Sequence, residues 1–499
     1  MGHRPAVPRP PKSTAQELAQ LDTTLGSSQP SQSSRPTITT TPGLHFKALA
    51  IPTATRLSAL IHSFDVWDAQ TMATLRERFG YLSDEMQQVL IDVRRRDDRR
   101  HPFYHAACFQ VTARWDLDRY TNILPFDYNR VRLVRPRVPV HRLHLPLSGQ
   151  PLSSPALSST ASADHRGEVD TEGPDLDDDD ESDYINASWV VPPWQGGQVY
   201  IATQGPISST IADFWWMVWQ QQVAVIVMLT KAVEKGALKC DVYWPSVGSS
   251  PEALPVGSAP AAHPPRLQFA ELGLQVSLVG ETYDESLGAI VRQLQLCRRA
   301  STTAAAAGAD RAQTLQITQL HYQSWPDHDV PKDPAQFQRL RSAVHRYQQH
   351  HNAQQSPVVV HCSAGCGRTG TLIALDYVQT ILESSPQQDP AAHFALLTSD
   401  TPPSSQSFYT GPRGMAHRLT IRAMRQSHPI LAPVAAELFA PYRGLSPQAV
   451  LAAGDIFFDM VRFLRCQRIY MVQSLAQYCF GYAILATAAT RLPRAPGNR

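Results

Sequence analysis

One ten-residue segment restricts what this chain of 499 residues can fold into more than any other segment does. Residues 361–370 read His-Cys-Ser-Ala-Gly-Cys-Gly-Arg-Thr-Gly, and they separate an apolar run at 358–360 from an apolar helix start. A buried strand followed by a glycine-rich loop and a helix can aim successive backbone N–H groups inward, and the helix adds its positive N-terminal end. The sequence therefore predicts a phosphate site in this loop.

Two side chains of the loop suit covalent phosphoryl chemistry. Cys362 is expected at the base of the loop, where the N–H groups and Arg368 favour the thiolate and lower the pKa of the thiol. Arg368 can donate two parallel hydrogen bonds to phosphoryl oxygens, while Gly365 and Gly367 let the backbone approach the ligand. The alternative is a buried structural cysteine in a tight turn, which does not account for the nine fixed positions of the run.

The run resembles the signature loop of the cysteine-dependent protein tyrosine phosphatases, of the non-receptor type. The resemblance implies that Cys362 is the nucleophile, that Arg368 clamps the phosphate, and that Thr369 offers its hydroxyl to the departing thiolate. It places His361 among the catalytic residues. It assigns substrate binding to the rest of the loop, namely Ser363, Ala364, Gly365, Cys366 and Gly367.

A Trp-Pro-Asp tripeptide at 325–327 lies 35 residues before Cys362. Expulsion of a tyrosyl oxygen calls for a general acid, because the conjugate acid of that oxygen is weak. Alone, the tripeptide is an ordinary turn, but residues 320–331 resemble the acid loop of the family. The resemblance makes Asp327 the acid of the first step and the base of the second. Asp329 stands where the family often has glycine, and we expect it to shift loop closure or the pH profile.

Two further segments resemble loops that surround the family's pocket. In residues 118–127, the ring of Tyr120 would stack on phosphotyrosine, and Asn122 would also contact substrate. In residues 234–245, Glu234 would orient Arg368 and Lys239 would face the acid loop. The alternative for the second segment is a solvated hairpin tip.

Residues 471–478 resemble the family's glutamine loop. On that resemblance Gln473 and Gln477 hold the hydrolytic water. Ser474 replaces the usual threonine and keeps the hydroxyl. More than a hundred residues separate Arg368 from Gln473, a longer interval than the family pattern, and part of that interval does not align.

The rest of the chain predicts a single α/β domain with a mixed, twisted sheet flanked by helices. Alternating apolar residues at 272–278 and 290–296 indicate antiparallel strands, and the continuous runs at 223–229 and 358–360 indicate buried ones. Helical spacing at 64–100 breaks at Gly80, which predicts two helices with Ser83 and Asp84 capping the second. Residues 214–219 form an aromatic core helix.

The boundaries follow from composition. We expect a disordered tail at 1–54, a catalytic domain at 55–490 and a short tail at 491–499. Low-complexity insertions are expected near four ranges, where they offer surface for regulatory partners: 134–182, 246–265, 300–312 and 384–450.

Charge and cysteine content exclude other classes of protein. The net charge of +2 provides no field for nucleic acid, and the seven cysteines lack the spacing of a zinc site. The apolar run at 223–229 is too short to cross a bilayer. We therefore expect a cytoplasmic protein with access to the nucleus, without membrane insertion or a zinc site. The resemblance implies that no metal or organic cofactor is needed and that the partners are tyrosine-phosphorylated proteins. The oligomeric state stays open.

Two alternatives compete with a tyrosine phosphatase. A catalytically silent phosphotyrosine-binding module would lack one of the four catalytic residues, and all four are present: Cys362, Arg368, Asp327 and Gln473. A dual-specificity or phosphoinositide phosphatase would need a shallower or more basic pocket than Tyr120 and the Glu234 loop predict.

Overall fold

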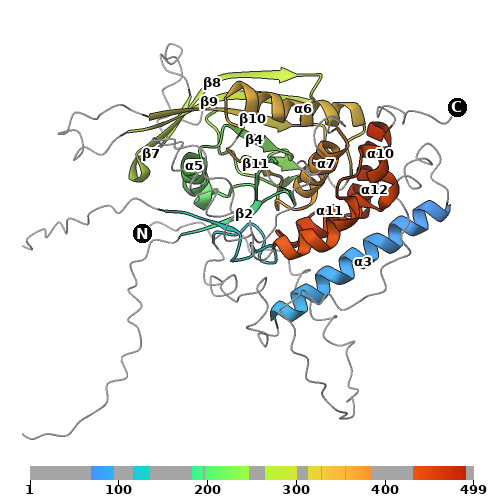
Figure 1. Cartoon of the computed structure of the whole chain (residues 1–499). Coiled ribbons are helices and arrows are strands. Elements are labelled where there is room, and N and C mark those ends of the chain that lie inside the picture. The colour runs from blue at the N-terminus through green and yellow to red at the C-terminus, as the bar shows by residue number, and fades with distance from the viewer. Residues whose placement is uncertain are drawn as a thin grey trace, which may run out of the picture. The chain divides into compact units, whose positions relative to one another are not determined.

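The computed structural model of the chain describes residues 69–94, 116–134, 183–194, 197–246, 265–299, 313–326, 329–354, 356–383 and 431–489. All of them belong to one compact unit, Leu44–Arg499. Within them a nine-stranded mixed sheet is flanked by helices, as Figure 1 shows, which confirms the predicted fold class. None of the helices in these ranges is long and apolar enough to cross a membrane.

The strands of the large sheet follow the order β1-β2-β3-β11-β4-β10-β9-β8-β7. The four strands β3, β11, β4 and β10 are parallel, and the other neighbours pair antiparallel. Two short strands, β5 and β6, form a separate hairpin. The bounds are β1 Arg130–Arg132, β2 Tyr184–Val190, β3 Tyr200–Thr203, β4 Val225–Met228, β5 Val233–Glu234, β6 Ala237–Leu238, β7 Arg266–Phe269, β8 Leu274–Asp284, β9 Ala289–Arg298, β10 Gln313–Tyr322 and β11 Val358–His361.

The strands at the centre of the sheet are apolar on both faces. Every residue of β4 and β11 is buried, as the continuous apolar runs predict. The alternating segments form the antiparallel pair β8 and β9, also as predicted. The carboxyl ends of the parallel strands β11, β4 and β10 meet at one edge of the sheet, which is where ligand sites form in such sheets.

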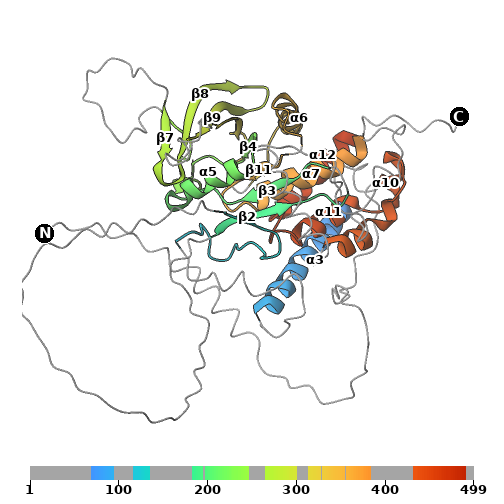
Figure 2. The same ribbon diagram turned by 60° about the vertical axis from the view of Figure 1, so that its left-hand side comes forward.

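The helices are α3 Ala69–Arg94, α5 Ile211–Gln220, α6 Pro334–His350, α7 Gly367–Glu383, α10 Pro447–Ala453, α11 Ile456–Arg465 and α12 Leu475–Ala489. Helix α5 buries the aromatic residues expected of a core helix. Helix α7 begins within the glycine-rich loop and packs against α11 and α12. In Figures 1 and 2, α3 runs along the outer side of α11 and α12.

The prediction of two helices at 64–100 is wrong, because α3 continues through Gly80. The Ser83 hydroxyl donates to the Phe79 carbonyl at 2.9 Å, so it bonds the preceding turn instead of capping a new helix. Packing on α11 and α12 outweighs the low helix propensity of one glycine. The ion pair between Glu85 and Arg462, at 2.8 Å, fastens the second half of α3.

The expected insertions fall mostly outside the described residues. This holds for 135–182, 247–264, 300–312 and 384–430, and for both tails. The last part of the insertion expected at 384–450 is described, and it is not a low-complexity surface segment. Residues 431–439 are helical, and Leu431 and Phe439 are fully buried. Apolar residues at helical spacing therefore attach this segment to the core.

Candidate active site

The phosphate loop leaves the end of β11 and enters α7 at Gly367. Gly365 has a φ of +72°, and a Cβ atom built there would lie 2.2 Å from the carbonyl oxygen of Thr203. Only glycine fits this position, because both the backbone conformation and the space exclude a side chain. The loop therefore lies tightly on β3, with the N-terminus of α7 at its end.

Cys362 is 5% exposed at the base of the loop. Burial opposes its ionisation, but the Thr369 hydroxyl, the charge of Arg368, and the backbone N–H groups of Thr369 and Cys366 together lower the pKa of the thiol below its ordinary value. Within the described chain, the Thr369 hydroxyl has no partner of normal hydrogen-bond geometry, which leaves it available to the sulfur. The site thus favours a thiolate.

Arg368 is held by the β5–β6 hairpin. Its guanidinium donates to both carboxylate oxygens of Glu234, at 2.6 and 2.8 Å, and to the Leu229 carbonyl at 3.0 Å. Burial opposes the Glu234 charge, but Arg368 outweighs burial and lowers the pKa of Glu234. The Thr230 hydroxyl and the Lys231 N–H also donate to this carboxylate, at 3.0 and 3.2 Å. The structure thus brings together the two residues that the resemblance paired.

A second arginine supports the loop from beneath, and the sequence analysis missed it. Arg468 is completely buried and donates to the carbonyl oxygens of Ala364 and Gly365, both at 2.9 Å. It also donates to Asn186 and Ser188 of β2. Because these loop carbonyls bond the buried Arg468, they point toward the protein interior. The only sequence signal was an arginine shortly before Gln473.

The glutamine loop lies against the start of α7. The Gln477 side-chain oxygen accepts from the N–H groups of Gln473 and Ser474, at 3.0 and 3.2 Å. A Cβ atom at Gly367 would lie 2.8 Å from that oxygen, so glycine allows the close approach. The side chain of Gln473 is exposed. The structure therefore brings both predicted glutamines to the phosphate loop.

A buried arginine, Arg465, fixes the glutamine loop, and the sequence analysis missed this residue too. It donates to the carbonyl oxygens of Met471 and Val472, at 2.9 and 2.8 Å. The same guanidinium bonds the carbonyl of Leu82 in α3. Val472 has a φ of +57°, a strained conformation for a β-branched residue, which these bonds hold in place.

The wall formed by Tyr120 is tied to the phosphate loop. Ser363 donates its hydroxyl to the Lys239 carbonyl at 2.8 Å, so the Tyr120 hydroxyl must be the donor in its 2.8 Å bond to Ser363. Asn122, two residues after Tyr120, is exposed. Next to Tyr120, Arg119 reaches across to the carbonyls of Gly205 and Pro206.

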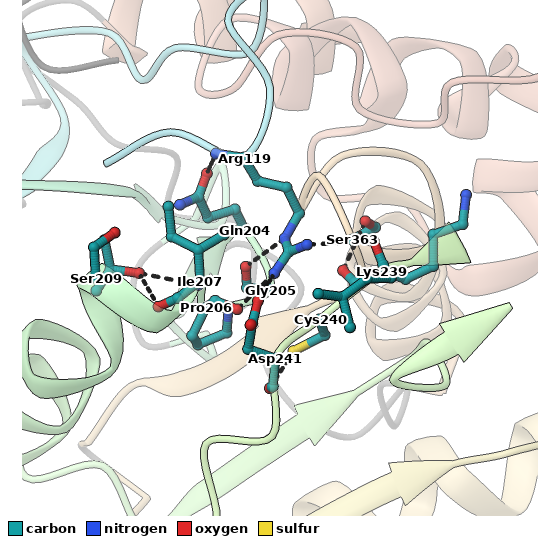
Figure 3. A network of polar contacts seen from close by, with 12 residues as sticks. Arg119, Gln204, Gly205, Pro206, Ile207, Ser209, Lys239, Cys240, Asp241 and Ser363 are labelled. Carbon is teal, nitrogen blue, oxygen red and sulfur yellow. Dashed lines mark hydrogen bonds and ion pairs between the residues drawn. The ribbon is translucent and has the colours of Figure 1, made fainter. Parts of the chain in front are cut away.

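Figure 3 shows the guanidinium of Arg119 at the centre of a polar network around the loop. It also bonds Asp241 at 2.6 Å, while its backbone N–H donates to Gln204. Arg119 therefore holds the segment of Tyr120 against the turn at 204–206 and the irregular segment after β6. The sequence analysis did not single out this arginine.

Asp327 lies outside the described residues. Its neighbour Trp325 is 2% exposed and donates its indole N–H to the Asp329 carbonyl at 2.8 Å. The described part of the acid loop is therefore anchored at Trp325, and Asp329 takes part in this turn through its backbone.

His361 is buried beneath the loop. Its Nδ1 contacts the Cys362 carbonyl at 3.0 Å and its Nε2 contacts the Tyr243 hydroxyl at 2.7 Å. Burial lowers the pKa of His361 to about 4, so the ring is neutral at pH 7. Both ring nitrogens are engaged within the protein, which makes His361 a support of the loop rather than a contact of the substrate.

The comparisons with known proteins agree with this geometry. The family model described as protein-tyrosine phosphatase matches residues 115–407. Human receptor-type tyrosine-protein phosphatase H is 32% identical over 329 residues, which are 65% of this chain and 22% of that protein. Human tyrosine-protein phosphatase non-receptor type 12 is 29% identical over 286 residues, which are 57% of this chain and 27% of that protein.

Mouse tyrosine-protein phosphatase non-receptor type 13 is 35% identical over 211 residues, which are 42% of this chain and 7% of that protein. A buried thiol of lowered pKa and an arginine held by a carboxylate lie together at the carboxyl edge of the mixed sheet. The chain belongs to the protein-tyrosine phosphatase family. It spans roughly a quarter or less of the length of the relatives named here.

Proposed function

We propose that this chain hydrolyses phosphotyrosine in proteins through a cysteinyl-phosphate intermediate. The observation that carries the proposal is the pairing of a Cys362 thiol of lowered pKa with an Arg368 guanidinium held by Glu234. A thiolate nucleophile and a bidentate phosphate clamp are the two parts that such a reaction needs.

The reaction has two steps. In the first, the Cys362 sulfur attacks phosphorus and forms a P–S bond while the P–O bond to tyrosine breaks. Asp327 gives its proton to the departing tyrosyl oxygen, and Arg368 binds the charge on the phosphoryl oxygens. Because the tyrosyl oxygen then leaves neutral, the step avoids a phenolate in a buried pocket.

In the second step, water attacks phosphorus and the P–S bond breaks. Asp327 takes a proton from the water, which Gln473 and Gln477 position. The Thr369 hydroxyl stabilises the Cys362 thiolate as it leaves. The products are inorganic phosphate and the enzyme in its starting form. No metal or organic cofactor takes part in either step.

The substrates of the proposal are tyrosine-phosphorylated proteins, with Tyr120 and Asn122 at the mouth of the pocket and Lys239 beside it. We also propose a protein of the non-receptor type, cytoplasmic with access to the nucleus. Its catalytic domain would extend over 55–490, and its insertions would offer surface to regulatory partners. Deletion of 1–50 together with 140–178 should then leave kcat on an aryl phosphate within about threefold.

The activity is tested with wild type, Cys362→Ser and Asp327→Ala. Each protein is given a phosphotyrosine peptide and a matched phosphoserine peptide. Wild type should release phosphate from phosphotyrosine alone. Cys362→Ser should bind the peptide without turnover, because a hydroxyl is a poor nucleophile at neutral pH. Cys297→Ser on β9 is the control and should retain activity.

A wild-type protein that binds phosphotyrosine and releases no phosphate would instead be a silent binding module. Faster release from phosphoserine or from a phosphoinositide would identify the other class of phosphatase. Either result would overturn the proposal.

A further inference from the structure

A buried arginine outside the catalytic machinery lies on β9 of the large sheet. Arg292 of β9 pairs across the strands with Glu281 of β8 on one side and with Gln319 of β10 on the other. The three side chains therefore form one row across neighbouring strands. The guanidinium stacks 4.3 Å above the ring of Trp244, and Arg292 is only 4% exposed.

Arg292 is joined to Cys362 by four successive hydrogen bonds. Its Nη1 donates to the Gln319 side-chain oxygen at 2.9 Å, and the Gln319 amide nitrogen donates to the Tyr243 hydroxyl at 2.7 Å. Tyr243 then bonds His361 Nε2, and His361 Nδ1 bonds the Cys362 carbonyl. We call this series the cysteine branch.

A second series leads from Arg292 to the phosphate clamp. Its Nη1 also contacts Nδ1 of His321 at 3.1 Å, two residues along β10 on the same face as Gln319. His321 Nε2 contacts the Thr230 carbonyl at 2.9 Å, and the Thr230 hydroxyl donates to Glu234, the partner of Arg368. We call this series the clamp branch.

The bond directions in both branches agree with an Arg292 that can only donate and with Glu234, Cys362 and Thr230 oxygens that can only accept. A guanidinium can only donate, so Gln319 must present its oxygen to Arg292 and its NH₂ group to Tyr243. Tyr243 therefore points its proton at His361 Nε2, which leaves the proton of His361 on Nδ1, facing the Cys362 carbonyl. In the clamp branch His321 must accept at Nδ1, so it carries its proton on Nε2.

We propose that Arg292 is a positioning residue that selects the tautomer of His361 and supports that of His321, and that it thereby holds the Cys362 carbonyl and Glu234, the partner of Arg368. Without this donor, the Gln319 amide could turn over and present its oxygen to Tyr243. The Tyr243 proton would then point away from His361, and the Cys362 carbonyl would lose its donor. The amide group itself allows both orientations, so Arg292 selects between them.

The consequence for turnover rests on the proposed function, but the tautomers can be measured without turnover. Long-range ¹H–¹⁵N NMR of protein labelled in histidine should show His361 protonated on Nδ1 and His321 on Nε2. If these tautomers are present and no phosphotyrosine is hydrolysed, the proposed function fails while this inference stands.

Gln319→Glu is the decisive variant. Beside Arg292 the new carboxylate stays ionised and can only accept hydrogen bonds. It should therefore accept one from the Tyr243 hydroxyl, and the side-chain volume is almost unchanged. His361 should switch to the Nε2 tautomer while His321, still bonded to Arg292, keeps its own. A loss of folding alone would not switch one histidine and spare the other. Gln316→Glu, exposed on the same strand, is the matched control and should change neither.

The change of the His361 tautomer should also alter the pKa of the Cys362 thiol. With the Cys362 carbonyl unsupported, half-maximal alkylation of Cys362 by iodoacetate should move to higher pH by about half a unit. Arg292→Met should leave His361 as a mixture of tautomers, whereas the Thr230 carbonyl, which can only accept, still keeps the His321 proton on Nε2. If this variant does not fold, Gln319→Glu still decides. A folded Gln319→Glu protein with His361 unchanged, or a wild-type His361 protonated on Nε2, would overturn the inference.

Discussion

Both carboxylate oxygens of Glu234 accept hydrogen bonds from the guanidinium of Arg368, at 2.6 and 2.8 Å. Two parallel bonds between planar groups fix the plane of the guanidinium as well as its position. A single hydrogen bond would leave the guanidinium free to rotate about the axis of that bond. Glu234 therefore determines the orientation in which Arg368 meets a phosphoryl group, although the two residues lie on different elements.

Glu234→Gln should lower kcat/KM for an aryl phosphate by about tenfold to a hundredfold, because one charge-assisted bond of the pair is lost. Steady-state kinetics on a small substrate measure the effect. Glu383→Gln is a matched control, since Glu383 also accepts two bonds from an arginine, Arg341, but at the far end of α7. Equal activity losses in the two variants would contradict the orienting role of Glu234.

Gly365→Ala should destabilise the protein by about 2 kcal/mol or more and remove most activity. The new methyl group meets the Thr203 carbonyl, and alanine also disfavours a φ of +72°. Urea unfolding measures the free energy. Gly236→Ala separates the two causes, because Gly236 has a similar φ of +78° and open space around it. If both variants lose the same stability, the contact with Thr203 contributes nothing.

The pair of the half-buried His345 and the buried Asp376 should make stability depend on pH. Their side chains lie 2.5 Å apart between α6 and α7. Burial opposes the charge on His345, but Asp376 outweighs it and raises the pKa of the ring. A raised pKa stabilises the fold below the ordinary histidine range, and the contribution is lost as the pH rises through the folded value.

His345→Asn should therefore lower Tm more at pH 6 than at pH 9. Thermal unfolding at the two pH values, compared with wild type, provides the measurement. His350→Asn, exposed on the last turn of the same helix, accounts for the loss of a histidine alone. A decrease of the same size at both pH values would show that the charge of His345 does not stabilise the junction.

Peroxide should inactivate the protein at Cys362, and dithiothreitol should restore it, because a thiolate of lowered pKa oxidises first. Cys366→Ser should leave this recovery unchanged. The Cys366 side chain packs with Met86 and Phe126 in a small apolar cluster separate from the one that holds Cys362 and Cys240. Burial also raises the pKa of Cys366 to about 11.

Mass spectrometry of mildly oxidised protein distinguishes the partners of Cys362. A disulfide to Cys240, or condensation with the backbone, agrees with the packing. A disulfide between Cys362 and Cys366 would show that the loop rearranges on oxidation.

The sequence predicts the parts of this molecule whose causes are local. Interactions within a few residues explain three of these parts: the apolar runs that form β4 and β11, the glycine at 365, and the spacing of Cys362 and Arg368. They allowed the sheet class and the phosphate loop to be predicted.

The supporting arginines depend on partners far away in the chain. Arg468 bonds carbonyls about a hundred residues earlier, and any residue supplies a carbonyl, so no sequence pattern marks the partner. The continuity of α3 through Gly80 likewise depends on packing against α11 and α12, which local propensity does not include.

The bond from Arg465 to Leu82 determines where a minimal catalytic fragment can begin. The similarity to the family starts at residue 115, and a boundary drawn there would remove α3 entirely. Arg465 would lose one of its three carbonyl partners, and Arg462 would be left without Glu85. Removing one partner of a buried ion pair costs about 3–5 kcal/mol, a large part of the stability of a domain. A fragment meant to keep the glutamine loop in order therefore has to include the part of α3 that carries Leu82 and Glu85.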